Sequence, residues 1–210
     1  MNPRSDISLV ISAPSGAGKT TIIKKVMNED DRLGFSISTT TRTQRPGEIN
    51  GKSYYFISRE EFEKLIAQDE FIEWAEVHGN LYGTLRKEID RIRALGKIPL
   101  FDIDVQGGIN LKNRLESPVM IFIIPPSLEI LEQRLRNRKT DSEEQIKIRL
   151  ANAIGELAQY GIYDYIIIND DISEAVKNFK TIVAAELMKT PFVSEKIKKI
   201  LARKNDNTFR

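Results

Sequence analysis

A short loop of small residues, lying between an apolar run and an amphipathic pattern, constrains this chain more than any other stretch. The apolar run at residues 7–11 predicts a short buried strand, and Ile22, Ile23 and Val26 predict the start of a helix. The loop between them reads Ala13-Pro14-Ser15-Gly16-Ala17-Gly18-Lys19-Thr20. Small residues let successive backbone N–H groups curl around an anionic phosphate, and a helix N-terminus favours negative charge. The stretch therefore predicts a nucleoside-triphosphate site rather than an ordinary glycine-rich turn.

The loop departs at one position from the phosphate-binding pattern G-x-x-x-x-G-K-[ST], because Ala13 stands where the first glycine belongs. Alanine fits there only if its φ is negative, so the interpretation depends on the geometry of the turn. We expect Lys19 to reach the β- and γ-phosphates and the Thr20 hydroxyl to bind a magnesium ion. The loop residues expected to bind ATP are Ala13, Pro14, Ser15, Gly16, Ala17, Gly18, Lys19, Thr20 and Thr21.

Composition narrows the class of protein. The 210 residues are enough for one sizeable domain with inserted parts, and the net charge of +2 is too small to argue for nucleic acid or an anionic membrane as the main partner. The absence of cysteine excludes disulfides and thiolate metal sites, and it is compatible with a reducing cytosol. We find no signal-peptide pattern and no apolar run of bilayer length, so the expected location is the cytoplasm.

Strands and helices alternate along most of the chain, which predicts an α/β fold with a parallel sheet flanked by helices. Further strands are expected at 34–38, 54–57, 71–77, 81–85, 98–104, 119–124 and 165–168, the last of them buried, and further helices at 58–67, 86–95, 105–113, 128–137, 142–160 and 172–188. The predicted division of the single 1–210 domain is a core (1–37, 86–125 and 160–188), a small β-rich insertion (38–85), a helical lid (126–159) and a basic tail (189–210).

Two carboxylates, Asp102 and Asp104, lie two residues apart at the end of an apolar strand, so we expect them to face the same side. In open α/β sheets this end of a strand borders the ligand crevice. One carboxylate would suit a magnesium shell, here assigned to Asp102, and the other a polar substrate group. The alternative is a solvated pair that caps the next helix.

Glu73 is the lone acid of the apolar segment Phe71-Ile72-Glu73-Trp74 in the strand expected at 71–77. An ionised carboxylate only accepts hydrogen bonds, and guanine offers two adjacent donors where adenine offers a donor beside an acceptor. Glu73 could therefore select guanine, with Ser38 and Thr84 completing the polar edge. A solvent-facing strand residue is an equally good interpretation of Glu73 taken alone.

Arginines in two regions are candidates for phosphate binding. Arg42 and Arg45, with Tyr54 and Tyr82 within chain reach, could clamp a second phosphate, because guanidinium forks match phosphate geometry. In the lid, arginines could stabilise charge on the transferring phosphoryl group, with 137–141 as a hinge. Ordinary surface charge is the alternative for both groups. The lid candidates are Arg134, Arg138 and Arg149.

Three features are interpreted as structural. We expect His78 to be a surface or packed residue and Trp74 to belong to the core. In the tail, Ile197, Ile200 and Leu201 recur at helical spacing among lysines and arginines, which predicts a docked amphipathic helix with a wet basic side.

Longer motifs resemble those of the guanylate kinases, and the resemblance extends over residues 7–188. The second motif is the most specific, because it is long and matches the family's signature for the GMP site. The motifs are Ser12-Ala13-Pro14-Ser15-Gly16-Ala17-Gly18-Lys19-Thr20, Thr40-Thr41-Arg42-x-x-Arg45-x-x-Glu48-x-x-Gly51-x-x-Tyr54-x-Phe56, Phe71-Ile72-Glu73, Gly79-Asn80-x-Tyr82-Gly83-Thr84, Asp102-Ile103-Asp104-x-Gln106-Gly107 and Ile168-Asn169-Asp170-Asp171.

The resemblance implies a P-loop nucleoside monophosphate kinase fold and a Mg²⁺-dependent transfer of phosphate from ATP to GMP, by a monomer or small homo-oligomer. It implies catalytic or triphosphate roles for Lys19 and the three lid arginines, and an adenine-side contact for Asn169. The residues implied to contact GMP are Ser38, Arg42, Arg45, Tyr54, Glu73, Tyr82, Gly83, Thr84 and Asp104.

Two alternatives stay open from the sequence. Non-catalytic peptide-binding modules also use this fold, but they usually have a degraded phosphate loop, whereas Lys19 and Thr20 are intact here. A kinase for another nucleoside monophosphate is the second alternative, and Glu73 with Thr84 argues against it.

Overall fold

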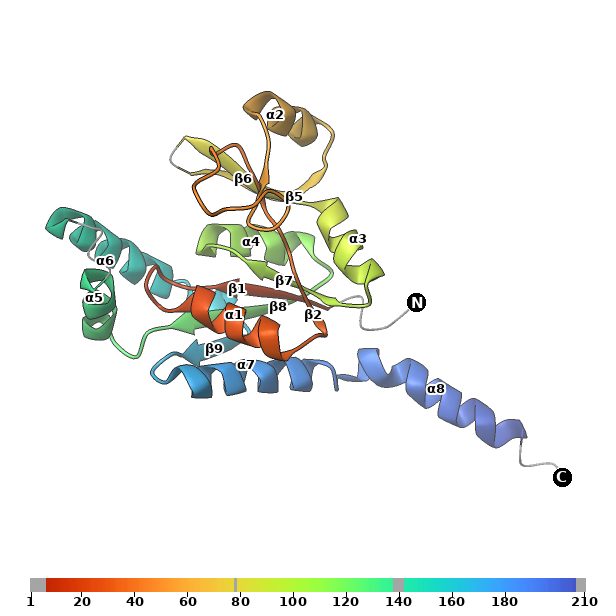
Figure 1. Cartoon of the computed structure of the whole chain (residues 1–210). Coiled ribbons are helices and arrows are strands. Elements are labelled where there is room, and N and C mark those ends of the chain that lie inside the picture. Colours follow the sequence, from red (N-terminus) through yellow and green to blue (C-terminus); the bar gives the residue numbers. More distant parts are fainter. Residues whose placement is uncertain (1–6, 78, 138–141, 207–210) are drawn as a thin grey trace.

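A five-stranded parallel sheet lies at the centre of the molecule (Figure 1). The structure is a computed structural model and describes residues 7–77, 79–137 and 142–206. The strands are, in spatial order, β2 (Leu33–Phe35), β7 (Ile98–Asp102), β1 (Ile7–Ser12), β8 (Ser117–Ile124) and β9 (Tyr165–Ile168). All the pairs in this sheet are parallel, which confirms the predicted fold class.

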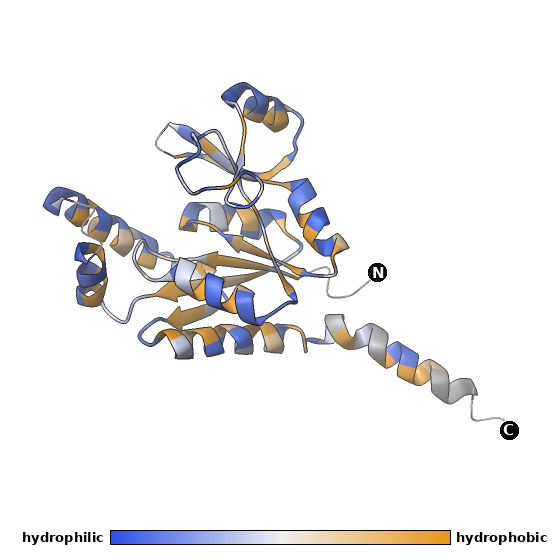
Figure 2. Cartoon of the chain, viewed as in Figure 1, coloured by the Kyte–Doolittle hydropathy of each residue, from blue (hydrophilic) through white to orange (hydrophobic). Residues whose placement is uncertain are grey.

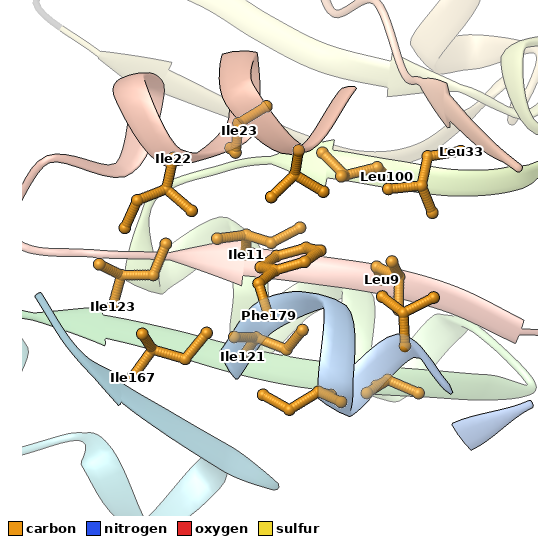
Figure 3. Packing of buried hydrophobic residues seen from close by; sticks show 14 of the residues in the cluster. Leu9, Ile11, Ile22, Ile23, Leu33, Leu100, Ile121, Ile123, Ile167 and Phe179 are labelled. Carbon is orange, nitrogen blue, oxygen red and sulfur yellow. The ribbon is translucent and has the colours of Figure 1, made fainter. Parts of the chain in front are cut away.

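Helices cover both faces of this sheet, so the central strands are apolar on both sides. In β1, Leu9 and Ile11 face one layer and Val10 the other, as the two-residue period of a strand requires. Figure 3 shows Leu9 and Ile11 in the first layer, with Ile22 of α1 and Phe179 of α7. Helices α1 (Lys19–Glu29) and α7 (Ile172–Glu186) cover that face, and α3 (Arg86–Ala94) and α4 (Val105–Arg114) pack on the other.

The insertion between β2 and α3 forms a second, four-stranded sheet with its own small core. Its strands are, in spatial order, β4 (Tyr55–Phe56), β3 (Thr39–Thr40), β6 (Asn80–Leu85) and β5 (Phe71–Val77). Phe62, on α2 (Arg59–Ala67), stacks on Phe71 with ring centroids 4.2 Å apart. Ser58 caps α2, because its hydroxyl accepts from the Glu61 N–H at 3.1 Å. The predicted β-rich character of this segment is confirmed.

The two helices of the predicted lid, α5 (Leu128–Arg136) and α6 (Glu143–Leu157), pack on each other through a small apolar cluster that includes Leu131, Leu135 and Ala153. A 3₁₀ turn (Tyr160–Ile162) then leads into β9. The predicted hinge at 137–141 falls almost entirely outside the described residues, as does His78.

Three structural expectations were wrong. Strand β9 is not fully buried: Ile166 and Ile168 are 46% and 56% exposed, because β9 is an edge strand with one uncovered face. Helix α8 (Thr190–Asp206) forms but does not dock. It projects from the end of α7 (Figure 1), and Ile197, Ile200 and Leu201 are exposed. An amphipathic pattern specifies a helix and its apolar side, but not a partner for that side.

The third correction concerns Trp74, which is 41% exposed rather than part of the core. The register of β5 against β6 shifts between Phe71 and Glu73, as at a β-bulge. Phe71 and Ile72 are both buried, and beyond the irregularity Glu73 turns inward while Trp74 turns to solvent.

Hydropathy follows this architecture, since the core strands are largely hydrophobic and the helices mix polar and apolar positions (Figure 2). Within the described part of the chain, we find no helix long and apolar enough to cross a lipid bilayer.

Candidate active site

The loop between β1 and α1 has the backbone geometry expected of a phosphate loop. Gly16 and Gly18 have φ of 98° and 96°, which a side chain would strain. Among the described residues other than glycine, only Asp69 has a positive φ. Ala13 therefore has the negative φ that an alanine needs at the first position of the loop pattern. Gly18 precedes α1 directly as its N-cap residue, so the loop opens onto a helix N-terminus.

The loop is also closely packed from two sides. A Cβ on Gly16 would lie 2.9 Å from Leu131 Cδ1 of the lid, and one on Gly18 would lie 2.3 Å from Asn169 Nδ2. The Asn169 amide donates to the Ala17 carbonyl at 2.7 Å. Both glycines therefore serve close approach as well as backbone conformation.

The Lys19 side chain reaches the end of β7, the strand next to β1. Its Nζ lies 2.6 Å from Asp102 Oδ1 and donates to the Ile103 carbonyl at 2.7 Å. The loop borders a pocket of about 330 Å³ lined by Ala13, Pro14, Ser15, Gly16, Gly18, Lys19, Thr20, Thr21, Asp104 and Glu156. Nearly all the loop residues expected at an ATP site thus line a single pocket, and Ala17 is buried beneath it.

Two of the three lid arginines reach the phosphate loop. Arg134 donates from Nη2 to the Asn169 carbonyl at 2.9 Å and from Nη1 to the Ala17 carbonyl at 3.5 Å. Arg149 donates from Nη1 to Ser15 Oγ at 3.5 Å. Arg138 lies outside the described residues.

Glu156 lines this pocket as well, and sequence reasoning missed it. Burial raises the pKa of its carboxyl, and the negative charge of Asp104 adds to the effect. The available signal was spacing: Glu156 follows Arg149 by seven residues on α6, so the two side chains share a helix face.

A second pocket, of about 210 Å³, lies between the insertion and the core. It brings together residues of both sheets that are far apart in the sequence. It is lined by Ser38, Tyr54, Glu73, Ala75, Val77, Tyr82, Gly83, Asp102, Ile103, Asp104 and Gly107. Six of the residues expected to contact GMP line it: Ser38, Tyr54, Glu73, Tyr82, Gly83 and Asp104.

Glu73 is the buried acid of this pocket, only 6% exposed, so the solvent-facing interpretation is wrong. Its Oε1 accepts a hydrogen bond from Thr84 Oγ1 at 2.8 Å. Burial raises the pKa of the Glu73 carboxyl to about 7, against the Thr84 hydrogen bond, which lowers it. The positive charge of Arg114, on α4, also lowers the pKa of the Glu73 carboxyl. Arg114 donates to the carbonyl of the neighbouring Ile72 at 3.0 Å. Sequence reasoning did not identify Arg114.

Arg42 lies beside Tyr54 and Tyr82, but it does not itself line the second pocket. Its Cζ is 5.3 Å from the centroid of the Tyr54 ring, and the Tyr54 and Tyr82 rings are 6.1 Å apart. Glu48 links the two arginines, since its carboxylate accepts from Arg42 Nη2 at 2.7 Å and from the Arg45 N–H at 2.8 Å. The Arg45 residue is exposed and does not line the second pocket.

Asp102 and Asp104 both border the second pocket, which agrees with the expectation that they face the same side. Asp104 also fulfils the alternative, because its Oδ1 caps α4 by accepting from the Gly107 N–H at 2.7 Å. Asp104 lines both pockets, so the pockets adjoin at this residue.

Comparison with known proteins identifies the family. The family model described as guanylate kinase matches residues 5–186. The chain belongs to the guanylate kinase family. It is 46% identical to the guanylate kinase of Geobacter sulfurreducens, over 95% of this chain and 98% of that protein. It is 47% identical to that of Geobacter metallireducens, over 92% and 96%.

A solved relative agrees with the fold. The crystal structure of guanylate kinase from Anaplasma phagocytophilum is similar at a TM-score of 0.70, with 39% sequence identity and 88% of each chain covered. The chain is therefore a nucleoside monophosphate kinase, a transferase with the guanylate kinase fold.

Proposed function

We propose that this guanylate kinase transfers the γ-phosphoryl group of ATP to GMP, giving ADP and GDP, and that the two pockets hold the two substrates. The observation that carries this assignment is the shared border at Asp104, because in-line transfer needs the two phosphates side by side. The phosphate-loop pocket takes ATP, and the pocket between insertion and core takes GMP.

The ATP side is built mainly from backbone. The N–H groups of the loop cradle the phosphates, and Asn169 lies on the adenine side. Lys19, Arg134, Arg138 and Arg149 neutralise charge as it develops on the transferring group. Lys19 must release Asp102 or share it, since the two form an ion pair at 2.6 Å. The acceptor oxygen of GMP is already ionised, so no side chain needs to act as a strong base.

The GMP side is built mainly from side chains. Glu73 accepts from the guanine ring N–H and amine, and the Thr84 hydroxyl orients this carboxylate through its 2.8 Å hydrogen bond. Ser38 and Asp104 complete the polar lining. Arg42, Arg45, Tyr54 and Tyr82 hold the GMP phosphate, Arg45 by moving in from its exposed position, and Gly83 leaves room beside Glu73.

The donor set also fits a magnesium ion that arrives with ATP. Among the described residues, no group of three or more carboxylate or histidine side chains could hold a metal ion. Mg²⁺ commonly binds through one or two protein oxygens, substrate phosphates and water, so Thr20 and Asp102 are sufficient. Thr20 and Asp102 would hold the ion, which would supply positive charge that neutralises the phosphates.

We propose three working parts: the core (1–37, 86–125 and 160–188), the GMP-binding insertion (38–85) and the lid (126–159). Lid closure would keep water from the transferring group. The proposed setting is the cytoplasm, with ATP and GMP as the partners of a monomer or small homo-oligomer. The cysteine-free sequence and small net charge support this setting.

A coupled assay of ADP release tests the assignment, with ATP, Mg²⁺ and either GMP, AMP, CMP or UMP as acceptor. Turnover with GMP alone is the expected result. Turnover with another nucleotide would keep the kinase chemistry and remove the base-selecting role of Glu73. No turnover with any acceptor would contradict the proposed reaction.

A further inference from the structure

Glu88 is a buried carboxylate with no role in the chemistry described above. It lies in the first turn of α3, its residue is 2% exposed, and α3 is the element that returns the chain from the insertion to the core. In Figure 1, α3 runs from the insertion down beside the parallel sheet. A buried carboxylate is stable only when hydrogen bonds and opposite charge compensate its lost hydration, so its partners indicate what it holds.

Four hydrogen bonds reach the Glu88 carboxylate from three residues. The Ile37 N–H donates to Oε1 at 3.0 Å, and the Tyr55 hydroxyl donates to Oε2 at 3.2 Å. Arg91, one turn along α3, donates from Nη2 to Oε1 at 2.6 Å and from Nε to Oε2 at 3.0 Å. Arg91 Nη2 also donates to the Phe35 carbonyl at 3.2 Å, at the end of β2.

These partners lie on both chain crossings between core and insertion. Ile37 belongs to the outgoing crossing, between β2 and β3, and Glu88 itself follows the return crossing, between β6 and α3. Through its hydrogen bond to Glu88, Tyr55 also fixes β4, the edge strand of the insertion's own sheet. One carboxylate therefore ties the outgoing strand, the return helix and the edge of the second sheet together.

The held positions are neighbours of two residues that line the GMP pocket. Ser38 follows Ile37, and Tyr54 precedes Tyr55. The Tyr55 N–H also donates to the Ser38 carbonyl at 2.9 Å, so the two stretches move together. The opposite wall of the pocket, with Asp102 and Asp104, belongs to the core. The width and alignment of the pocket depend on how the insertion sits on the core.

We propose that Glu88 is a positioning residue for GMP binding, which holds the Ser38–Tyr54 wall of the pocket at a fixed setting relative to the core. It does not touch substrate. This inference rests on the proposed GMP site. The phosphate loop shares no hydrogen bond with this cluster among the described residues, so the effect falls on one substrate only.

The same structure provides a matched control far from the site. Glu186, on α7, is 3% exposed, accepts from the Tyr165 hydroxyl at 2.6 Å and pairs with Lys189, three residues on, at 2.7 Å. Glu88 likewise combines a tyrosine hydroxyl with a cation three residues on. Disrupting the Glu186 cluster should lower stability without selecting one substrate.

The experiment measures KM for GMP, KM for ATP, kcat and Tm for Glu88→Gln, Tyr55→Phe and their double variant, beside Glu186→Gln and Tyr165→Phe. We expect Glu88→Gln to raise the KM for GMP about tenfold, because a charge-assisted cluster is weakened. We expect KM for ATP to change less than about twofold. Tyr55→Phe should have a smaller effect of the same kind, and the double variant should be less than additive because the two residues are in contact.

Two results would overturn the proposal. One is a fall in Tm for Glu88→Gln that matches Glu186→Gln, with the KM for GMP unchanged. The other is an equal rise in both KM values, which would indicate general loosening. Ser38→Ala and Tyr54→Phe measured in parallel separate this failure from failure of the site. If they raise the KM for GMP and Glu88→Gln does not, the positioning role alone is wrong; if they too have no effect, the placement of GMP is wrong and the inference falls with it.

Discussion

The two pockets that we propose for ATP and GMP are made in different ways. The phosphate-loop pocket is lined largely by one unbroken stretch, 13–21, whose backbone is set by two left-handed glycines and by a helix that follows at once. The pocket between insertion and core takes its lining from five separate stretches of chain between residues 38 and 107, and its polar groups belong mostly to side chains. A phosphate needs only N–H groups, which every residue but proline has, whereas a base needs particular side chains at particular places.

This contrast predicts that changes on the phosphate side reduce the rate for every acceptor, while changes on the insertion side alter which acceptor is used.

The largest effect is expected for Lys19→Met. The variant keeps the length of the side chain and removes the charge that neutralises the transferring group, so kcat should fall by about 10³ or more with any acceptor. Steady-state rates with saturating ATP and GMP measure this. Lys24→Met, an exposed position on the same helix, is the control and should retain the rate of the original enzyme. A near-normal rate for Lys19→Met would remove the phosphate-loop half of the contrast.

Glu73→Gln should change selectivity more than rate. Glutamine presents an amide donor where guanine needs a second acceptor, so the preference for GMP over AMP in kcat/KM should fall by about 100-fold, with KM for ATP nearly unchanged. Competition assays with both acceptors give this ratio. The exposed Glu76, three residues along the same strand, offers Glu76→Gln as the control. Unchanged selectivity in Glu73→Gln would show that base reading lies elsewhere.

The next prediction concerns pH, because the pKa of Glu73 is raised to about 7 by burial. Guanine needs the ionised form, so protonation below that value should weaken GMP binding, and KM for GMP at pH 6 should be about tenfold above its high-pH value. Titrating KM from pH 5.5 to 8.5 tests this. GMP's own phosphate also titrates, near pH 6, and Glu73→Gln should keep that part of the profile and lose the rest.

The same shift has a consequence for stability in the ligand-free protein. A carboxyl whose pKa is raised on folding favours the folded state below about pH 4.5, and this contribution is lost as pH rises through about 7. Glu73→Gln should therefore gain stability relative to the original protein as pH is raised from 5 to 8, by about 2–3 kcal/mol at most. Denaturant titrations at both pH values measure the difference, and a constant difference would mean that the carboxyl is not shifted.

The smallest effect is expected for Glu48→Gln, which weakens the hold on Arg42 and on the Arg45 backbone. The side chains of Arg42 and Glu48 are only 12% and 22% exposed, but glutamine still offers an acceptor oxygen, so the KM for GMP should rise only about two- to fivefold, with KM for ATP constant. Glu63→Gln, in an exposed pair with Arg59 on α2, is the matched control. A rise in both KM values would count against a phosphate clamp confined to the insertion.

The difference between the pockets also explains what the sequence could and could not predict. The phosphate loop, α1 and the parallel sheet follow from local signals: an apolar run, small residues and a helical period. Strand β5 was predicted at its observed bounds, but the exposure of Trp74 was not, because that depends on a register shift against β6 that no local pattern encodes.

Long-range partners were the harder part. Ile37 and Glu88 are 51 positions apart, so only the packed fold brings this carboxylate to that N–H. Arg114 was missed for the same reason, since it donates to the Ile72 carbonyl, 42 positions away. Glu156 was missed although its spacing from Arg149 on α6 was a local signal. The undocked α8 shows the converse limit, because its amphipathic period indicates an apolar side whether or not another element covers it.

Ala13 has a consequence for how phosphate loops are recognised in other chains. A pattern search that demands glycine at this position excludes chains such as this one. The backbone at Ala13 requires only a φ that an L-residue can adopt. The two later glycines are different, because each has a positive φ and a neighbour inside the volume of a methyl group. A search for distant relatives should therefore relax the first position, keep the glycine at the Gly18 position, and add a glycine at the Gly16 position, where the pattern allows any residue.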